Sequence, residues 1–137
     1  MYVCRNFDIR ELVPYGVWKN TDNKQLLWWL FDDRMLKVAD KLRDAYGKMV
    51  GNDWAWGGDK KMCGFRPWES ETGSRLSQHK FGRAFDSTPY ETDVKVIRQD
   101  IIDRKHPFME EIKGLELGVS WLHFDLRNSN ELVTFRP

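Results

Sequence analysis

The fold of this chain is decided by the stretch Ser77-Gln78-His79-Lys80-Phe81-Gly82-Arg83-Ala84-Phe85-Asp86, read together with Trp121-Leu122-His123-Phe124-Asp125. The two stretches supply two imidazoles and a carboxylate in apolar or glycine-containing surroundings. This is the number of protein ligands in a catalytic zinc site, which keeps a fourth position open for water. The ligand count therefore indicates a catalytic rather than a closed structural site.

Alternation along a strand defines the two faces of the second stretch. Successive side chains of a strand point to opposite faces, so His123 and Asp125 are expected on one face and Leu122 with Phe124 on the other. One face would then carry the chemistry while the reverse face packs.

The spacing within the first stretch requires a bend. His79 and Asp86 are seven positions apart, and a regular strand would send them to opposite faces. We expect Gly82 to bend the chain so that both side chains reach one site.

Composition indicates a single globular domain spanning residues 1–137. A domain of this length buries about two-thirds of the surface that its unfolded chain exposes, so it needs no disulfide or other cross-link to fold. The 41% hydrophobic and 31% charged residues are typical of a globule, and a net charge of +1 provides no field to attract nucleic acid. Two isolated cysteines, Cys4 and Cys63, predict neither a disulfide framework nor a fourth zinc ligand.

The N-terminal residues alternate apolar and charged side chains and lack the apolar run of a signal peptide. No later run approaches the ~18 apolar residues of a membrane span. We therefore expect synthesis in the cytoplasm without a signal peptide, and no membrane insertion.

Periodicity and turn residues predict an α+β fold with a small antiparallel sheet packed against two or three helices. Helices are expected from about Asp22 to Tyr46 and from Glu91–Asp93 to before Pro107. Strands are expected at Met49 to Trp56, Phe81 to Thr88, Leu115 to Leu117, Val119 to Leu126 and Leu132 to Phe135.

The ligand stretches have recognisable flanks. The pattern Ser-x-His-x-x-Gly-x-Ala-x-Asp, followed by Trp-x-His-x-Asp, resembles the M15 family of zinc D-alanyl-D-alanine peptidases and its LAS-group relatives, which include the hedgehog-like zinc-binding domain. Gly64-Phe65-Arg66 resembles the arginine-bearing segment of that family, and the likeness extends roughly from Phe7 to Phe135. The compact form is most similar to versions found in bacteriophages.

The resemblance implies a site and a cofactor. His79, Asp86 and His123 would bind Zn²⁺, and the sheet would carry this zinc site in a hedgehog/DD-peptidase-like fold. Arg66 would bind a substrate carboxylate or the developing oxyanion. Ser77 is a further candidate for hydrogen bonding to substrate.

The chain departs from the family at the general base. Many relatives place Glu or Asp three residues before the last His, where this chain has Ser120, and a hydroxyl cannot replace a carboxylate in that role. Glu116, across the Gly118 turn, and Asp125 are the two candidates, and Asp125 could instead orient a ligand.

The leading hypothesis is a zinc metallopeptidase that hydrolyses peptidoglycan stem peptides, as an endopeptidase or a D-Ala-D-Ala-type carboxypeptidase. A monomeric phage endolysin or virion-associated wall hydrolase is expected, reaching the cell wall through a holin or the virion. The alternative is a catalytically inactive, zinc-stabilised LAS-type structural or binding domain. A metal-free aromatic-rich interaction domain is a third hypothesis.

Overall fold

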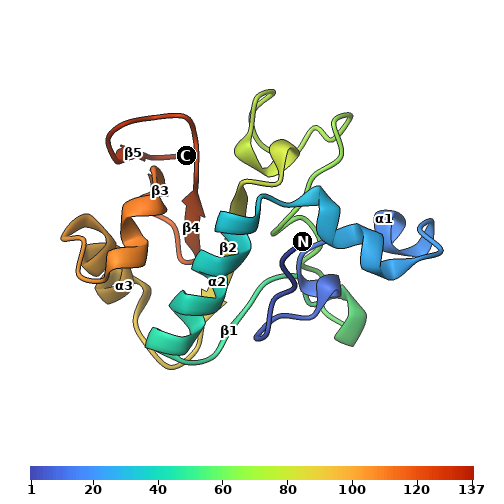
Figure 1. Cartoon of the computed structure of the whole chain (residues 1–137), viewed down its shortest axis with the longest axis horizontal. Coiled ribbons are helices and arrows are strands. Elements are labelled where there is room, and N and C mark those ends of the chain that lie inside the picture. The colour runs from blue at the N-terminus through green and yellow to red at the C-terminus, as the bar shows by residue number, and fades with distance from the viewer.

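The computed structural model describes residues 1–137 and contains one five-stranded sheet in the order β1-β2-β4-β3-β5 (Figure 1). The strands are β1 (Met49–Val50), β2 (Ala84–Pro89), β3 (Gly114–Glu116), β4 (Leu122–Asp125) and β5 (Val133–Phe135). The prediction of an α+β domain is confirmed.

The expectation of a purely antiparallel sheet is wrong at one edge. The pairs β1–β2, β2–β4 and β3–β4 are antiparallel, but β5 runs parallel to β3. Because β4 runs against β3, a chain that turns back after β4 and continues along the far side of β3 must arrive parallel to it. The sheet is therefore mixed.

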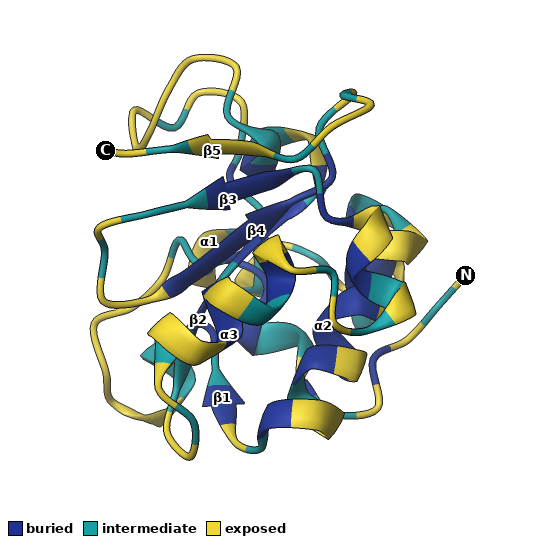
Figure 2. Cartoon of the chain, turned by 90° about the vertical axis from the view of Figure 1, so that its left-hand side faces the viewer, coloured by how far each residue is buried: buried dark blue, intermediate teal, exposed yellow.

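Three α-helices accompany the sheet: α1 (Tyr15–Lys19), α2 (Asp33–Tyr46) and α3 (Val94–Ile102). Helix α2 lies beside the sheet, with its buried residues directed inward and its exposed residues outward (Figure 2). Short 3-10 segments connect these elements: η1 (Ile9–Glu11), η2 (Lys24–Leu30), η3 (Trp54–Trp56), η4 (Gln78–Phe81) and η5 (Pro107–Glu111).

The continuous helix expected from Asp22 to Tyr46 is wrong in its first part. Buried Phe31 is extended, and Asp32 then caps α2 by accepting a hydrogen bond from the backbone N–H of Arg34. The N–H of Asp32 donates to the carbonyl of Gly82, just before the ligand-bearing strand. This tertiary bond and the cap favour a break that helical periodicity does not show.

The strand expected from Met49 to Trp56 is wrong beyond Val50. Asn52 is fully buried, donates to the carbonyl of Val13 and accepts from the N–H of Cys63. These bonds tie three separate segments together and take the chain out of the sheet. The last three residues of the expected strand, Trp54–Trp56, form η3 instead.

One hydrophobic core fills the space between α2, α3 and the sheet, and its largest fully buried side chains include Leu12, Met35, Leu42, Phe85, Ile97, Ile101 and Phe124. The N-terminal segment is tied to α2 by buried Asp40, whose carboxylate accepts from the N–H groups of Arg5 and Asn6. None of the helices has the length and apolar character needed to cross a membrane. The core leaves one face of β2, β4 and β3 to carry polar side chains.

Candidate metal centre

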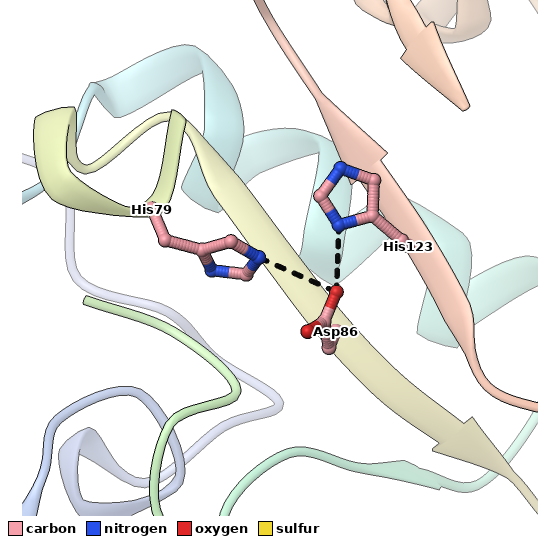
Figure 3. Close-up of side chains that lie close together, drawn as sticks. All are labelled: His79, Asp86 and His123. Atoms are coloured by element: carbon pink, nitrogen blue, oxygen red, sulfur yellow. Dashed lines mark hydrogen bonds and ion pairs between the residues drawn. The ribbon is translucent and has the colours of Figure 1, made fainter. Parts of the chain in front are cut away.

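Three side chains from separate segments converge on this face of the sheet. His79 Nε2 lies 3.4 Å and His123 Nδ1 lies 2.7 Å from the same oxygen, Oδ1 of Asp86 (Figure 3). One ligand atom from each residue lies within 4.8 Å of the others, so the group could hold a metal ion. The sequence prediction that these three residues lie together is confirmed.

The turn before β2 places His79. Ser77 caps η4 by accepting from the N–H of His79, and Gly82 ends η4 with a φ of 66° before β2 begins. This left-handed conformation suits glycine, and a Cβ there would lie 1.9 Å from the carbonyl oxygen of Leu30. The bend expected at Gly82 is therefore present, and it brings His79 to the same site as Asp86.

The orientation of the His79 ring is fixed by its outer nitrogen, the one that points away from Asp86. Nδ1 lies 2.8 Å from the carbonyl oxygen of Gly64, and a carbonyl only accepts, so Nδ1 carries the proton. Nε2 then offers a lone pair toward Asp86. Burial lowers the pKa of His79, which favours the neutral imidazole that binds metals.

The ring of His123 is fixed in the same way by a carboxylate. Its Nε2 lies 2.9 Å from Oδ2 of Asp125, which leaves Nδ1 facing Asp86. Asp125 is itself fully buried and is held by Arg127, whose Nε and Nη2 donate to its two oxygens at 2.8 and 2.7 Å. A histidine whose outer N–H is bound by a carboxylate is typical of metal centres.

Gly114 on β3 makes room for this arrangement. It lies opposite Asp125 in the β3–β4 register, and a Cβ at Gly114 would lie 2.1 Å from Oδ1 of Asp125. Only glycine leaves space for the carboxylate beneath His123.

The charges of the cluster are strongly coupled. Burial raises the pKa of Asp86, but the hydrogen bond from Nδ1 of His123 and the nearby imidazole of His79 outweigh burial and hold that pKa well below its usual range. Burial lowers the pKa of His123, yet the hydrogen bonds and charges of Asp125 and Asp86 prevail and raise it to about 9. In the metal-free site His123 therefore carries the proton that a metal ion would replace.

Arg66 reaches the cluster from the loop before η4. It is nearly buried; its Nη2 donates to Oδ2 of Asp86 at 3.2 Å and its Nε donates to the carbonyl of Met62 at 2.9 Å. Nη1 lies 3.4 Å from the carbonyl of Thr72. Guanidinium has five N–H donors, so two remain for a further group. Arg66 thus orients Asp86 and keeps free donors beside it.

Glu116 joins the site through the sheet register. The register pairs Gly114 with Asp125 and Leu115 with Phe124, so the next step brings Glu116 opposite His123. Opposite residues of an antiparallel pair share a face. Because Asp86 is the partner of His123 on β2, three neighbouring strands present Asp86, His123 and Glu116 as a row. Ser120, by contrast, is exposed in the loop before β4.

These side chains open into a cavity of about 650 Å³. Its lining includes every residue that the sequence singled out for the site: Arg66, Ser77, His79, Asp86, Glu116, His123 and Asp125. Exposed Leu76 and Trp121 contribute to its rim. The cavity gives a ligand access to the cluster.

The chain matches no protein-family model, no curated protein and no solved structure.

Sequence reasoning did not identify three supporting groups. The carbonyl of Gly64 holds His79, Arg127 holds Asp125, and Gly114 leaves space for that carboxylate. The spacing Asp125-x-Arg127 was the one available signal, because residues two apart on a strand share a face.

Proposed function

We propose that the chain is a zinc-dependent peptidase that hydrolyses peptidoglycan stem peptides and has a hedgehog/DD-peptidase-like fold. One observation carries the proposal: two imidazoles with satisfied outer nitrogens face a carboxylate, and a second carboxylate, Glu116, follows in the same row on the neighbouring strand. This combination would provide both a metal centre and a group that can transfer protons.

The donor set fits zinc. Two histidines and one carboxylate are the protein ligands of many catalytic zinc sites, whereas magnesium and calcium prefer oxygen ligands alone. When bound, zinc would polarise the scissile carbonyl and lower the pKa of water to about 7. His79, Asp86 and His123 would hold the ion.

Glu116 would act as the general base. Glu116 follows in register opposite His123 and lines the cavity, where its carboxylate would take a proton from the attacking water and pass it to the leaving amine. It therefore replaces the acid that relatives place at the position of Ser120.

Asp125 would orient His123 rather than transfer protons. Both of its oxygens already accept hydrogen bonds, from His123 and from Arg127, and it is fully buried. A carboxylate committed in this way keeps Nε2 of His123 protonated and Nδ1 available to the metal.

Arg66 and Ser77 would bind substrate. Arg66 keeps two N–H groups beyond its contacts with Asp86 and two carbonyls, enough to bind a carboxylate or a developing oxyanion. The hydroxyl of Ser77 caps η4 as an acceptor, and its proton remains free to donate at the cavity.

The substrate class follows from the resemblance to the M15 family and from the open cavity. We infer an endopeptidase or a D-Ala-D-Ala-type carboxypeptidase, active as a monomer at the bacterial cell wall as a phage endolysin or virion component. A holin or the virion would deliver it.

A specific feature favours one competing function. Ser120 stands where many relatives carry the catalytic acid, so the domain could bind zinc for stability alone and serve as an inactive structural or binding module. This alternative requires that Glu116 take no part in chemistry.

A digestion assay on purified peptidoglycan distinguishes the peptidase from the inactive module. The zinc-loaded protein, its Glu116→Gln variant and a chelator-treated sample are incubated with peptidoglycan, and the released peptides are identified by mass spectrometry. A peptidase produces new chelator-sensitive termini that Glu116→Gln, still loaded with zinc, fails to produce. Intact peptides from zinc-loaded wild-type protein would support the inactive module.

A further inference from the structure

A second cavity adjoins the metal centre. It measures about 450 Å³ and shares Arg66, Asp86 and Trp121 with the larger cavity. Beyond these shared residues its walls include Lys60, Lys61, Met62, Thr88 and Ser120. A peptide lying across the cluster could therefore place one residue on each side of Asp86.

Two lysines give the second cavity an uncompensated positive charge. Lys60 Nζ donates to the hydroxyl of Thr88 at 2.7 Å, and neither Lys60 nor Lys61 lies within ion-pair distance of an acidic group. Of the two acids in the lining, Asp86 is engaged by Arg66, which leaves Asp59 against two lysines. The cavity thus favours an anionic group.

The position of Lys60 is fixed by its backbone. Its N–H donates to Oδ1 of Asp53 at 2.8 Å, and its carbonyl accepts from the N–H groups of Asp53 and Trp54. The hydroxyl of Thr88 on β2 further restrains the ammonium. A charge held in this way can select a ligand with less loss of side-chain entropy on binding.

We propose that Lys60 and Lys61 form a subsite that binds a free carboxylate of the peptide, on a residue next to the bond that is cut. The inference rests on the proposed peptidase function and adds a specificity to it. Met62 and Trp121 supply apolar wall for the rest of that residue, while the ammonium groups bind its carboxylate. The net charge of the chain is only +1, so the two lysines are a local positive site and not part of a generally basic surface that attracts polyanions.

A series of peptides tests the subsite by binding, independently of cleavage. The probe is L-Ala-γ-D-Glu-meso-diaminopimelate-D-Ala-D-Ala, with its free carboxylates converted to carboxamides one at a time. Affinities are measured by calorimetry on zinc-loaded Glu116→Gln, in that background with Lys60→Gln and Lys61→Gln, and with the control pair Lys37→Gln and Lys41→Gln. The two control lysines are exposed on α2 and line neither cavity.

One amidation is expected to weaken binding about tenfold, since a charge-assisted hydrogen bond of ordinary strength corresponds to roughly that factor or more. The same amidation should have no effect in the Lys60/Lys61 variant and its full effect in the control. If no amidation shows an effect that the Lys60/Lys61 change removes, or if no peptide binds, the subsite is refuted.

Cleavage of the same peptides by the protein with Glu116 intact separates the two proposals. Normal cleavage without the lysine-dependent preference would remove the subsite and keep the peptidase. Lysine-dependent binding without cleavage would keep Lys60 and Lys61 as a carboxylate-binding subsite for the peptide and remove the peptidase.

Discussion

The hydrogen bond from His123 to Asp125 gives the sharpest prediction, for the substitution Asp125→Asn. The amide has the size of the carboxylate but one acceptor oxygen in place of two. That oxygen can face Arg127 or His123 and cannot serve both fully. If the NH₂ group faces His123, Nε2 must become an acceptor, the ring proton moves to Nδ1, and Nδ1 no longer binds metal.

The expected loss of zinc affinity is about 10- to 100-fold, the usual effect of removing an outer-shell partner of a metal ligand. It corresponds to roughly 1.4 to 2.7 kcal/mol. Competition with a chromophoric chelator measures the affinity, and circular dichroism checks that the variant is folded.

Asp40→Asn is the matched control. Asp40 is also fully buried and accepts several hydrogen bonds, from Tyr2, Arg5 and Asn6, but it lies outside the metal centre. This control should lower the free energy of unfolding and leave zinc affinity unchanged. Zinc affinity within twofold of wild type in folded Asp125→Asn would refute the orienting role of Asp125.

Three further predictions concern the same centre. Gly114→Ala should weaken zinc binding at least about tenfold in the chelator competition, because its Cβ displaces Asp125; unchanged affinity would contradict this. Gly82→Ala should lower the free energy of unfolding by more than Gly57→Ala in denaturant titrations, since both have positive φ but only Gly82 is crowded; equal losses would show that crowding is unimportant. For the metal-free protein, a folded pKa of about 9 at His123 contributes stability that is complete below the unfolded pKa of about 6.5 and is lost as pH rises toward 9. Between about pH 6.5 and 8, stability should fall by up to about 1.4 kcal/mol per pH unit; an equal slope in the His123→Gln variant would exclude this source.

The sequence predicted those features of the site that depend on local backbone geometry. Gly82 signalled the bend between His79 and Asp86, and strand alternation placed His123 with Asp125. Both relations depend on local geometry, which the spacing of residues records. The grouping of the three candidate ligands followed from them together with the resemblance.

The features of the fold that the sequence did not predict depend on contacts between distant segments. The break at Phe31 and Asp32 is stabilised by a hydrogen bond to Gly82, and the end of β1 by bonds of Asn52 to Val13 and Cys63. No local pattern contains these partners. The parallel pairing of β5 with β3 is likewise not local: β4 already pairs with β2 and β3, so β5 pairs with the edge of β3 that is left free.

The choice of general base likewise could not be made from the sequence. The sequence left two alternatives: Glu116, which the resemblance suggested as an acid at a shifted position, and Asp125, which strand alternation placed on the same face as His123. The structure distinguishes their surroundings: Asp125 is fully buried with both oxygens bound by His123 and Arg127, whereas Glu116 is only partly buried at the cavity. The register of β3 against β4 produces this difference.

Metal stoichiometry after native purification is the most direct measurement of the centre. Inductively coupled plasma mass spectrometry should find about one zinc ion per chain in the wild-type protein and in Asp40→Asn. It should find almost none in His79→Ala or His123→Ala, because each removes one of three protein ligands. Zinc content that is absent from folded wild-type protein, or unchanged in both histidine variants, would contradict the assignment of His79, Asp86 and His123 as a zinc centre.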